Sequence, residues 1–139
     1  MDNQGLLLVE DDGDDAELIL RLVRATFTHR KVRLARSGPE ALAILRGTPG
    51  QAPALVLLSL KLDWMGVLRA IRAEPASAGL PVVILGAFRD AREIAAAYDA
   101  GASSCVETPA RFEAFAEAVR AIGTYWLGMN LLPARSGQP

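Results

Sequence analysis

One stretch constrains this fold more than any other, an unbroken apolar run at residues 55–58 that ends at the polar residue Ser59. A loop rich in proline and glycine precedes the run. An apolar run of this length without polar alternation is typical of a strand that is buried on both faces, as in the centre of a parallel sheet. Functional residues of such sheets lie just beyond the carboxyl ends of the central strands. Ser59, Lys61 and Asp63 therefore stand where chemistry would be expected.

The rest of the chain repeats the same unit, a short apolar strand followed by an amphipathic helix. The predicted strands cover residues 5–9, 32–34, 55–58, 81–85 and 103–107. The helical patterns that follow them cover residues 16–27, 37–45, 67–72, 90–100 and 111–126. Five alternations in about 125 residues predict an α/β domain, in which a parallel sheet carries helices on both faces and the crossovers are right-handed.

Composition and charge limit the classes of function. The chain has 139 residues, enough for one domain with its own core. Its formal net charge of −1 gives no reason for general electrostatic binding to nucleic acid. Apolar runs of four or five residues are too short to span a membrane, and the polar start is unlike a secretory signal. One cysteine, Cys105, and one histidine exclude an internal disulfide and a cysteine–histidine zinc site. We therefore expect a cytoplasmic protein without nucleic-acid or membrane partners.

Four segments, in their order and spacing, carry a resemblance to a known family. They are Leu-Leu-Val-Glu-Asp-Asp at 7–12, Ser-Gly-Pro-Glu-Ala-Leu at 37–42, Pro-Val-Val-Ile-Leu at 81–85 and Ala-Tyr-Asp-Ala-Gly-Ala-Ser-Ser at 97–104. Together they resemble the receiver domain of two-component response regulators. The final helix looks like that of the single-domain regulators that partner bacterial phytochromes and related histidine kinases. The resemblance implies a flavodoxin-like (βα)5 fold with the sheet order 2-1-3-4-5.

The resemblance also implies a mechanism, self-phosphorylation, and this chain departs from it. In the family an aspartate at the end of the third strand takes the phosphoryl group from a phosphohistidine. Acidic residues after the first strand hold Mg²⁺, and a Thr or Ser and a Lys contact the phosphoryl group. Carried over, the acids are retained as Glu10 and Asp11, whereas Ser59 stands at the acceptor, Gly86 at the Thr/Ser position and Thr108 at the Lys position. The chain is thus predicted to be a degenerate receiver without catalysis, with no cofactor beyond weakly bound Mg²⁺.

Four further residues are predicted to surround the acids, namely Asp12, Lys61, Asp63 and Pro109. Lys61 could turn its ammonium toward Glu10 and Asp11 and replace the metal or the missing lysine. A first alternative is an active receiver that accepts the phosphoryl group at Ser59 or at a displaced site, Asp63. A serine phosphate would be a stable ester, and Asp63 is more typical of a solvated loop residue.

A second alternative is a flavodoxin-like protein that binds a small ligand. No glycine-rich phosphate loop follows the first predicted strand. The acidic residues at 10–15 would repel an anion there, whereas a phosphate site at a helix N-terminus needs free N–H groups and favourable charge. The sequence therefore argues against an anionic ligand.

The last helical pattern has two apolar faces, which predicts two packing partners. One face, expected in the core, holds Phe112, Phe115, Val119, Ile122 and Trp126. The other holds Ala114, Ala118, Ala121 and Tyr125 and, together with Trp126, predicts a homodimer interface. Leu127, Met129, Leu131 and Leu132 follow in a segment that the core does not require. We expect a receiver-like domain at 1–127, a partly flexible and dimer-forming tail at 128–139, and a histidine kinase or another signalling protein as partner.

Overall fold

A computed structural model of the chain describes residues 5–28, 30–47 and 52–132. The strands are β1 (Leu6–Val9), β2 (Val32–Ala35), β3 (Leu55–Ser59), β4 (Val82–Gly86) and β5 (Ser104–Glu107). The α-helices are α1 (Gly13–Thr26), α2 (Gly38–Leu45), α3 (Trp64–Ala73), α4 (Ala91–Asp99) and α5 (Phe112–Gly123). A π-helical segment, η1 (Thr124–Met129), continues α5. In the part of the chain that the structure describes, every helix is too short or too polar to span a bilayer.

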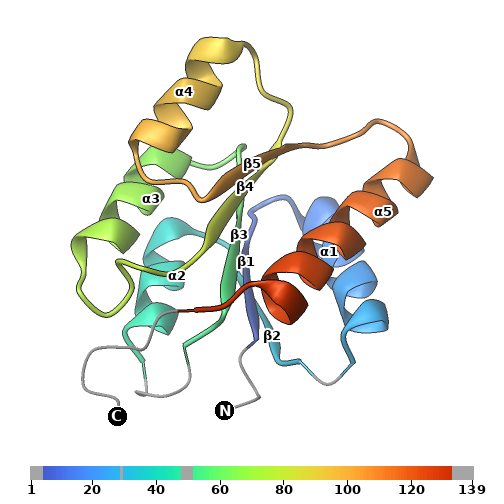
Figure 1. Cartoon of the computed structure of the whole chain (residues 1–139), viewed down its shortest axis with the longest axis horizontal. Coiled ribbons are helices and arrows are strands. Elements are labelled where there is room, and N and C mark those ends of the chain that lie inside the picture. The colour runs from blue at the N-terminus through green and yellow to red at the C-terminus, as the bar shows by residue number, and fades with distance from the viewer. Residues whose placement is uncertain (1–4, 29, 48–51, 133–139) are drawn as a thin grey trace.

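The five strands form one sheet in the order β2-β1-β3-β4-β5, and every neighbouring pair is parallel. This order confirms the predicted flavodoxin-like topology. Every residue of β1 and β3 is buried, as the unbroken apolar runs predicted. Figure 1 shows these strands at the centre of the molecule with helices on either side. Because all the strands run the same way, their carboxyl ends meet at one edge of the sheet.

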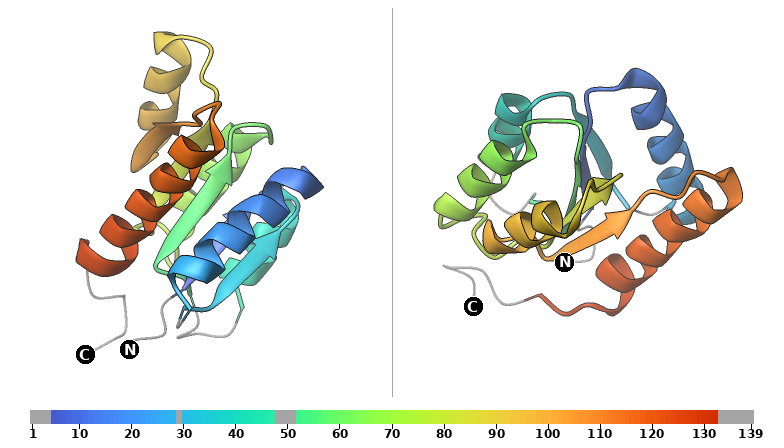
Figure 2. Two further views of the ribbon diagram at one scale, coloured as in Figure 1. Left: turned by 90° about the vertical axis from the view of Figure 1, so that its right-hand side faces the viewer. Right: turned by 90° about the horizontal axis from the view of Figure 1, so that it is seen from above.

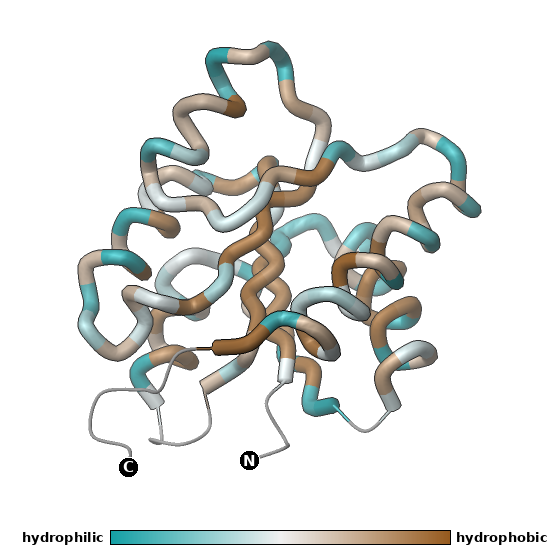
Figure 3. Tube along the Cα trace, in the orientation of Figure 1, coloured by the Kyte–Doolittle hydropathy of each residue, from teal (hydrophilic) through white to brown (hydrophobic). Residues whose placement is uncertain are grey.

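The helices form one layer on each face of the sheet (Figure 2). α1 and α5 cover one face, where Ile19, Val23 and Phe115 join the apolar side chains of the strands. α2, α3 and α4 cover the other, where Leu68 and Ile71 join the second half of the core. Figure 3 shows hydrophobic residues concentrated along the central strands. Helices therefore cover both faces of the sheet, and the ends of its strands remain accessible.

Short polar side chains begin four of the five α-helices. The Asp12 carboxylate accepts hydrogen bonds from the N–H groups of Asp14 and Asp15, both at 3.0 Å. Ser37, Asp63 and Asp90 cap α2, α3 and α4 in the same way. These bonds satisfy N–H groups that have no partner within the helix.

The C-terminal helix differs from the prediction at both ends. Phe112, predicted in the core, is 55% exposed, because it begins α5 beyond the ends of the strands, where no sheet lies beneath it. Leu127, predicted outside the core, is buried among the side chains of α1 and α5. A guanidinium nitrogen of Arg30 donates a hydrogen bond to the backbone carbonyl of Leu127 at 2.5 Å. The domain therefore uses η1 for its own packing. Residues 133–139 of the predicted tail lie outside the described part of the chain.

Candidate functional site

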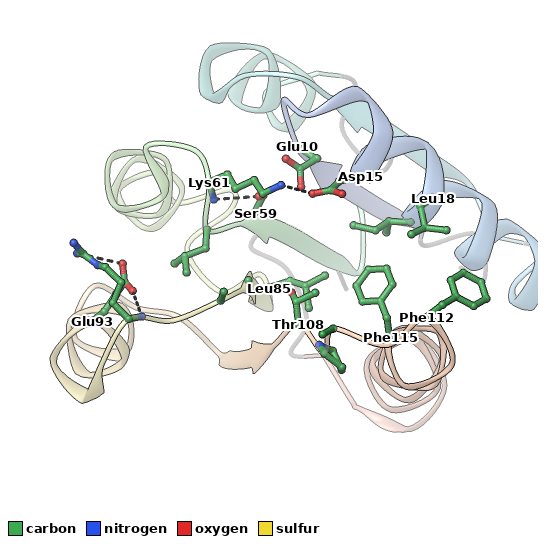
Figure 4. Close-up of a pocket in the computed structure, with 17 residues that line it drawn as sticks. Glu10, Asp15, Leu18, Ser59, Lys61, Leu85, Glu93, Thr108, Phe112 and Phe115 are labelled. Atoms are coloured by element: carbon green, nitrogen blue, oxygen red, sulfur yellow. Dashed lines mark hydrogen bonds and ion pairs between the residues drawn. The ribbon is translucent and has the colours of Figure 1, made fainter.

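The predicted site residues converge where the strands end. A cavity of about 630 Å³ opens there between α1, the ends of β3 and β4, and the start of α5 (Figure 4). Six of the predicted residues line it, namely Glu10, Ser59, Lys61, Gly86, Thr108 and Pro109. The other predicted residues, Asp11, Asp12 and Asp63, are not part of its lining.

Ser59 closes β3 and joins a short chain of hydrogen bonds. Its Oγ accepts a hydrogen bond from the N–H of Lys61 at 3.2 Å, and its hydroxyl bonds to the Glu10 carboxylate. Only 3% of Glu10 and 6% of Ser59 is exposed. A carboxylate is a weak base, so this bond does not by itself make the serine a nucleophile. The hydroxyl instead links the ends of β1 and β3.

Glu10 is a buried carboxyl group, and this changes how it titrates. Burial raises the pKa of Glu10 above its ordinary value, because loss of water penalises the charged form. Hydrogen bonds to the carboxylate oppose this effect. The N–H of Asp12 donates to Oε2 at 3.2 Å, and Ser59 supplies the second bond. The net direction of the pKa shift remains upward.

Lys61 brings an ammonium group to the acids, but not to the pair that we expected. Its Nζ lies 2.5 Å from the Asp15 carboxylate and 3.6 Å from that of Asp12, rather than pairing with Glu10 and Asp11. Asp12 caps α1 and Asp15 lies three residues later in its first turn, so the two carboxylates reach the same side. The bond to Asp15 raises the pKa of Lys61. Sequence reasoning missed Asp15, although this spacing was a signal for it.

Gly86 leaves room that a neighbouring side chain fills. A Cβ atom added at Gly86 would overlap the Cβ of Leu60, the residue that follows β3. Leu60 is half-buried and packs against the core beneath α2, α3 and α4. A threonine or serine at position 86 would therefore meet an occupied space. Nothing in the sequence pattern indicated this role of Leu60.

Thr108 continues the backbone of β5 but gives the site no cation. Its N–H donates to the carbonyl of Gly86 at 2.9 Å, and its half-buried side chain lines the cavity beside Pro109. A threonine offers a hydroxyl in place of a lysine ammonium. Thus none of the residues at the acceptor, Thr/Ser and Lys positions supplies the group that the family mechanism uses there.

Asp11 and Asp63 lie away from the large cavity. Both line a second hollow beside α2 and α3, together with Arg36. The Asp63 carboxylate accepts a hydrogen bond from the N–H of Gly66 at 3.3 Å, at the start of α3. Asp63 is exposed, as predicted for a solvated residue, and this contact also makes it the cap of α3. Asp63 and Ser59 therefore do not share the large cavity.

The donor atoms at this edge do not fit a Mg²⁺ site of the family's kind. A hard cation needs several oxygen ligands, usually from more than one carboxylate. Glu10 accepts two hydrogen bonds, and the Lys61 ammonium stands beside Asp12 and Asp15. Among the described residues, no three Asp, Glu, His or Cys side chains are grouped so that they could hold a metal ion.

The residues predicted for a dimer interface form a partly exposed face of α5 and η1. Ala114 and Ala118 are half-buried, whereas Ala121 and Tyr125 are exposed. Trp126 packs partly against the α1–α5 core and meets the Tyr125 ring edge-on, at 5.0 Å between centroids and 89° between planes. This face exposes less apolar surface than the sequence pattern suggested, because Trp126 packs partly against the domain's own core.

Comparison with known proteins bears on the whole chain. Residues 6–120 match the family model of the response regulator receiver domain. The chain is 36% identical over 135 residues to the probable methanogenesis regulatory protein FilR2 of Methanothrix harundinacea, across 92% of this chain and 86% of FilR2. It is 26% identical over 136 residues to the response regulator Rcp1 of Synechocystis, across 93% and 92%. The solved structure of the phosphorylated cyanobacterial phytochrome response regulator RcpA matches with a TM-score of 0.84 at 29% identity, across 95% of this chain and 99% of RcpA.

These matches agree with the topology of the sheet. The matched residues run from β1 to the interior of α5, so they include every strand of the sheet and the whole edge that holds the cavity. FilR2 exceeds 30% identity over most of both chains. The chain therefore belongs to the response regulator receiver domains of two-component signalling and is similar to the single-domain, phytochrome-associated regulators Rcp1 and RcpA.

Proposed function

We propose that this receiver domain acts without phosphorylation, as a pseudo-receiver that works by binding another protein. The observation that carries the proposal is Ser59 at the end of β3, where the family has its phosphoacceptor aspartate. Its hydroxyl bonds to Glu10 and its Oγ accepts from the N–H of Lys61. The Leu60 side chain beside Gly86 and the uncharged Thr108 support the same conclusion. Such a protein is not an enzyme and needs no Mg²⁺.

A direct phosphorylation assay tests this proposal. The protein is incubated with acetyl phosphate and Mg²⁺, and its intact mass is measured, with an active receiver as the control for the reagents. We expect no added phosphate on this chain. A stoichiometric adduct would overturn the proposal.

The main alternative is an active receiver that uses a displaced acceptor. Ser59 and Asp63 are the two candidates, and they lead to different products. An acyl phosphate on Asp63 would be lost in alkali, whereas an ester on Ser59 would survive acid. Mass spectrometry of Ser59→Ala and Asp63→Asn, after the same incubation, assigns any adduct to one residue.

We also propose that this receiver pairs with a second copy of itself. We place it in the cytoplasm and expect no nucleic-acid partner. The face of Ala114, Ala118, Ala121 and Tyr125 supports a dimer, because Tyr125 is 48% exposed next to small side chains. A symmetric pair would bury this face on both copies. A histidine kinase or another signalling protein would then bind elsewhere on the dimer.

Sedimentation at micromolar concentration tests the dimer. We expect a dimer for the unchanged chain and a monomer for Tyr125→Arg. Tyr98→Arg is a matched control, since Tyr98 on α4 is 49% exposed and lies outside this face. A monomeric unchanged chain, or equal effects of the two variants, would contradict the interface.

A further inference from the structure

The cavity at the carboxyl ends of the strands has two chemically different ends. Leu18 and Ile19 of α1 and Phe115 of α5 form an apolar wall. Glu10 and Ser59 lie at the polar end, as Figure 4 shows. Its volume of about 630 Å³ falls in the range of small-molecule sites, roughly 300–1,000 Å³. Such sites combine an apolar lining with a few polar groups that orient the ligand.

The charges that line the cavity leave one carboxylate in excess. The Lys61 ammonium bonds to Asp15 at 2.5 Å. The Arg89 guanidinium pairs with Glu93 at 3.4 Å. Among the described residues Glu10 has no ion-pair partner, and Lys61 acts on it only at longer range. A ligand that brings a positive charge to the Glu10 end would complete the charge balance of the cavity, whereas an anion would be repelled.

We propose that the cavity binds a small amphipathic amine. Its ammonium group would donate to the Glu10 carboxylate, at the end marked by Ser59, and its apolar or aromatic body would lie along Leu18 and Phe115. A charge-assisted hydrogen bond is among the stronger polar contacts. Phe112, 55% exposed at the start of α5, would lose contact with water as the ligand covers it. Because the ligand would touch both α1 and α5, its binding would bring a chemical signal to this receiver.

Three ligands of similar size and different charge test the proposal, namely 2-phenylethylamine, 2-phenylethanol and 3-phenylpropanoate. Titration of the full chain is followed by NMR chemical shifts of the residues that line the cavity. The amine should bind most tightly, the alcohol more weakly, and the carboxylate not measurably. Equal binding of all three would overturn the proposal, as would no binding of the amine.

Glu10→Gln keeps the shape of Glu10 and one acceptor oxygen but removes its charge. It should weaken binding of the amine about tenfold or more, the equivalent of one charge-assisted hydrogen bond, and leave the alcohol unchanged. Glu117→Gln makes the same change of charge on an exposed position of α5 and should leave both unchanged. Equal effects of Glu10→Gln and Glu117→Gln would overturn the role of Glu10.

Thr108→Lys provides a second, independent test. Thr108 lines the same cavity, so a lysine there would place its own ammonium in the site and compete with the ligand. We expect this variant to lose binding of the amine, whereas Thr124→Lys, an exposed position of η1, should retain it. Undiminished binding by Thr108→Lys would contradict the proposed position of the ammonium. A lysine-containing peptide tests whether the amine belongs to a protein or to a free small molecule. A site for a free amine should bind 2-phenylethylamine more tightly than the peptide. These results do not depend on the outcome of the phosphorylation assay.

Discussion

Two groups of residues on the same edge of the sheet make different contributions to the structure. The acidic residues after β1 are those that the family also has there, and in this structure they stabilise the fold. Asp12 caps α1, and Glu10 accepts the N–H of Asp12 and the hydroxyl of Ser59. Across the cavity, at the ends of β3, β4 and β5, the positions that handle the phosphoryl group hold Ser59, Gly86 and Thr108. Among the described residues, the side chains that cap helices are Asp12, Ser37, Asp63 and Asp90, and none of them stands at these three positions.

Acidic residues at these positions can serve folding whether or not they bind a metal. A carboxylate at a helix start stabilises free N–H groups whether or not a metal binds. A phosphoacceptor, by contrast, contributes only when the reaction takes place. The presence of Glu10, Asp11 and Asp12 is therefore weak support for metal binding in this chain. Substitutions in the two groups should therefore differ in their effect on stability.

Ser59→Asp should give the largest effect. It places a second carboxylate beside the buried Glu10, and like charges at short range destabilise both ionised forms. We expect a loss of about 3 kcal/mol in the free energy of unfolding at pH 7 without metal. Mg²⁺ should restore part of it, because a cation relieves the repulsion. Urea unfolding with and without Mg²⁺ measures both effects, and Ser59→Asn is the uncharged control. Equal losses for the two variants would contradict the electrostatic explanation.

Gly86→Thr should be the next most destabilising change, since its side chain would overlap Leu60. Overpacking of this kind costs about 1–3 kcal/mol. The double variant Gly86→Thr/Leu60→Ala should recover part of the loss, because the smaller side chain frees the space. Thermal unfolding of both single variants and the double variant gives the coupling between the two positions. Strictly additive effects would show that Leu60 does not occupy this space.

Asp12→Ala tests whether the retained acid serves folding. Its carboxylate accepts the N–H groups of Asp14 and Asp15, and the bond to Asp15 is the main reason that the pKa of Asp12 is lowered. We expect Asp12→Ala to lower the melting temperature, by less than Gly86→Thr does. Asp12→Asn should keep the melting temperature close to that of the unchanged chain, because an amide oxygen also caps a helix. If Asp12→Asn were as damaging as Asp12→Ala, the charge rather than the cap would be responsible.

Glu10→Gln should give the smallest effect, and its sign depends on pH. Because the pKa of Glu10 is raised in the folded state, the folded protein holds this proton more tightly than the unfolded chain. Stability from this group is therefore lost as the pH rises from the ordinary value of 4.5 through the folded pKa. Glu10→Gln should gain stability relative to the unchanged chain at pH 7, and the gain should shrink toward pH 4.

Urea midpoints between pH 4 and 8 measure this difference. Asp15 and Lys61 face Glu10 and also affect its titration, so Lys61→Met is measured beside it. A difference between Glu10→Gln and the unchanged chain that grows as the pH falls would contradict the assigned direction of the pKa shift.

The order of the strands and the edge that holds the site could be predicted from the sequence. Unbroken apolar runs ending in polar residues mark buried parallel strands, so Glu10 and Ser59 had to meet at one edge. The contact of Lys61 with Asp15 could not be predicted with the same certainty, because it joins side chains 46 residues apart. Phe112 was misjudged for a similar reason. Periodicity shows which face a side chain takes but not what lies beyond the end of the sheet.

The Leu60 side chain fills the place of a side chain at position 86, so the residues at positions 60 and 86 depend on each other. Restoring a threonine at position 86 first would create a clash with Leu60. Trimming Leu60 first would leave a void beside the core that it packs against. Either single change is therefore expected to lower stability. A threonine at position 86 becomes compatible with this packing only when both residues change together.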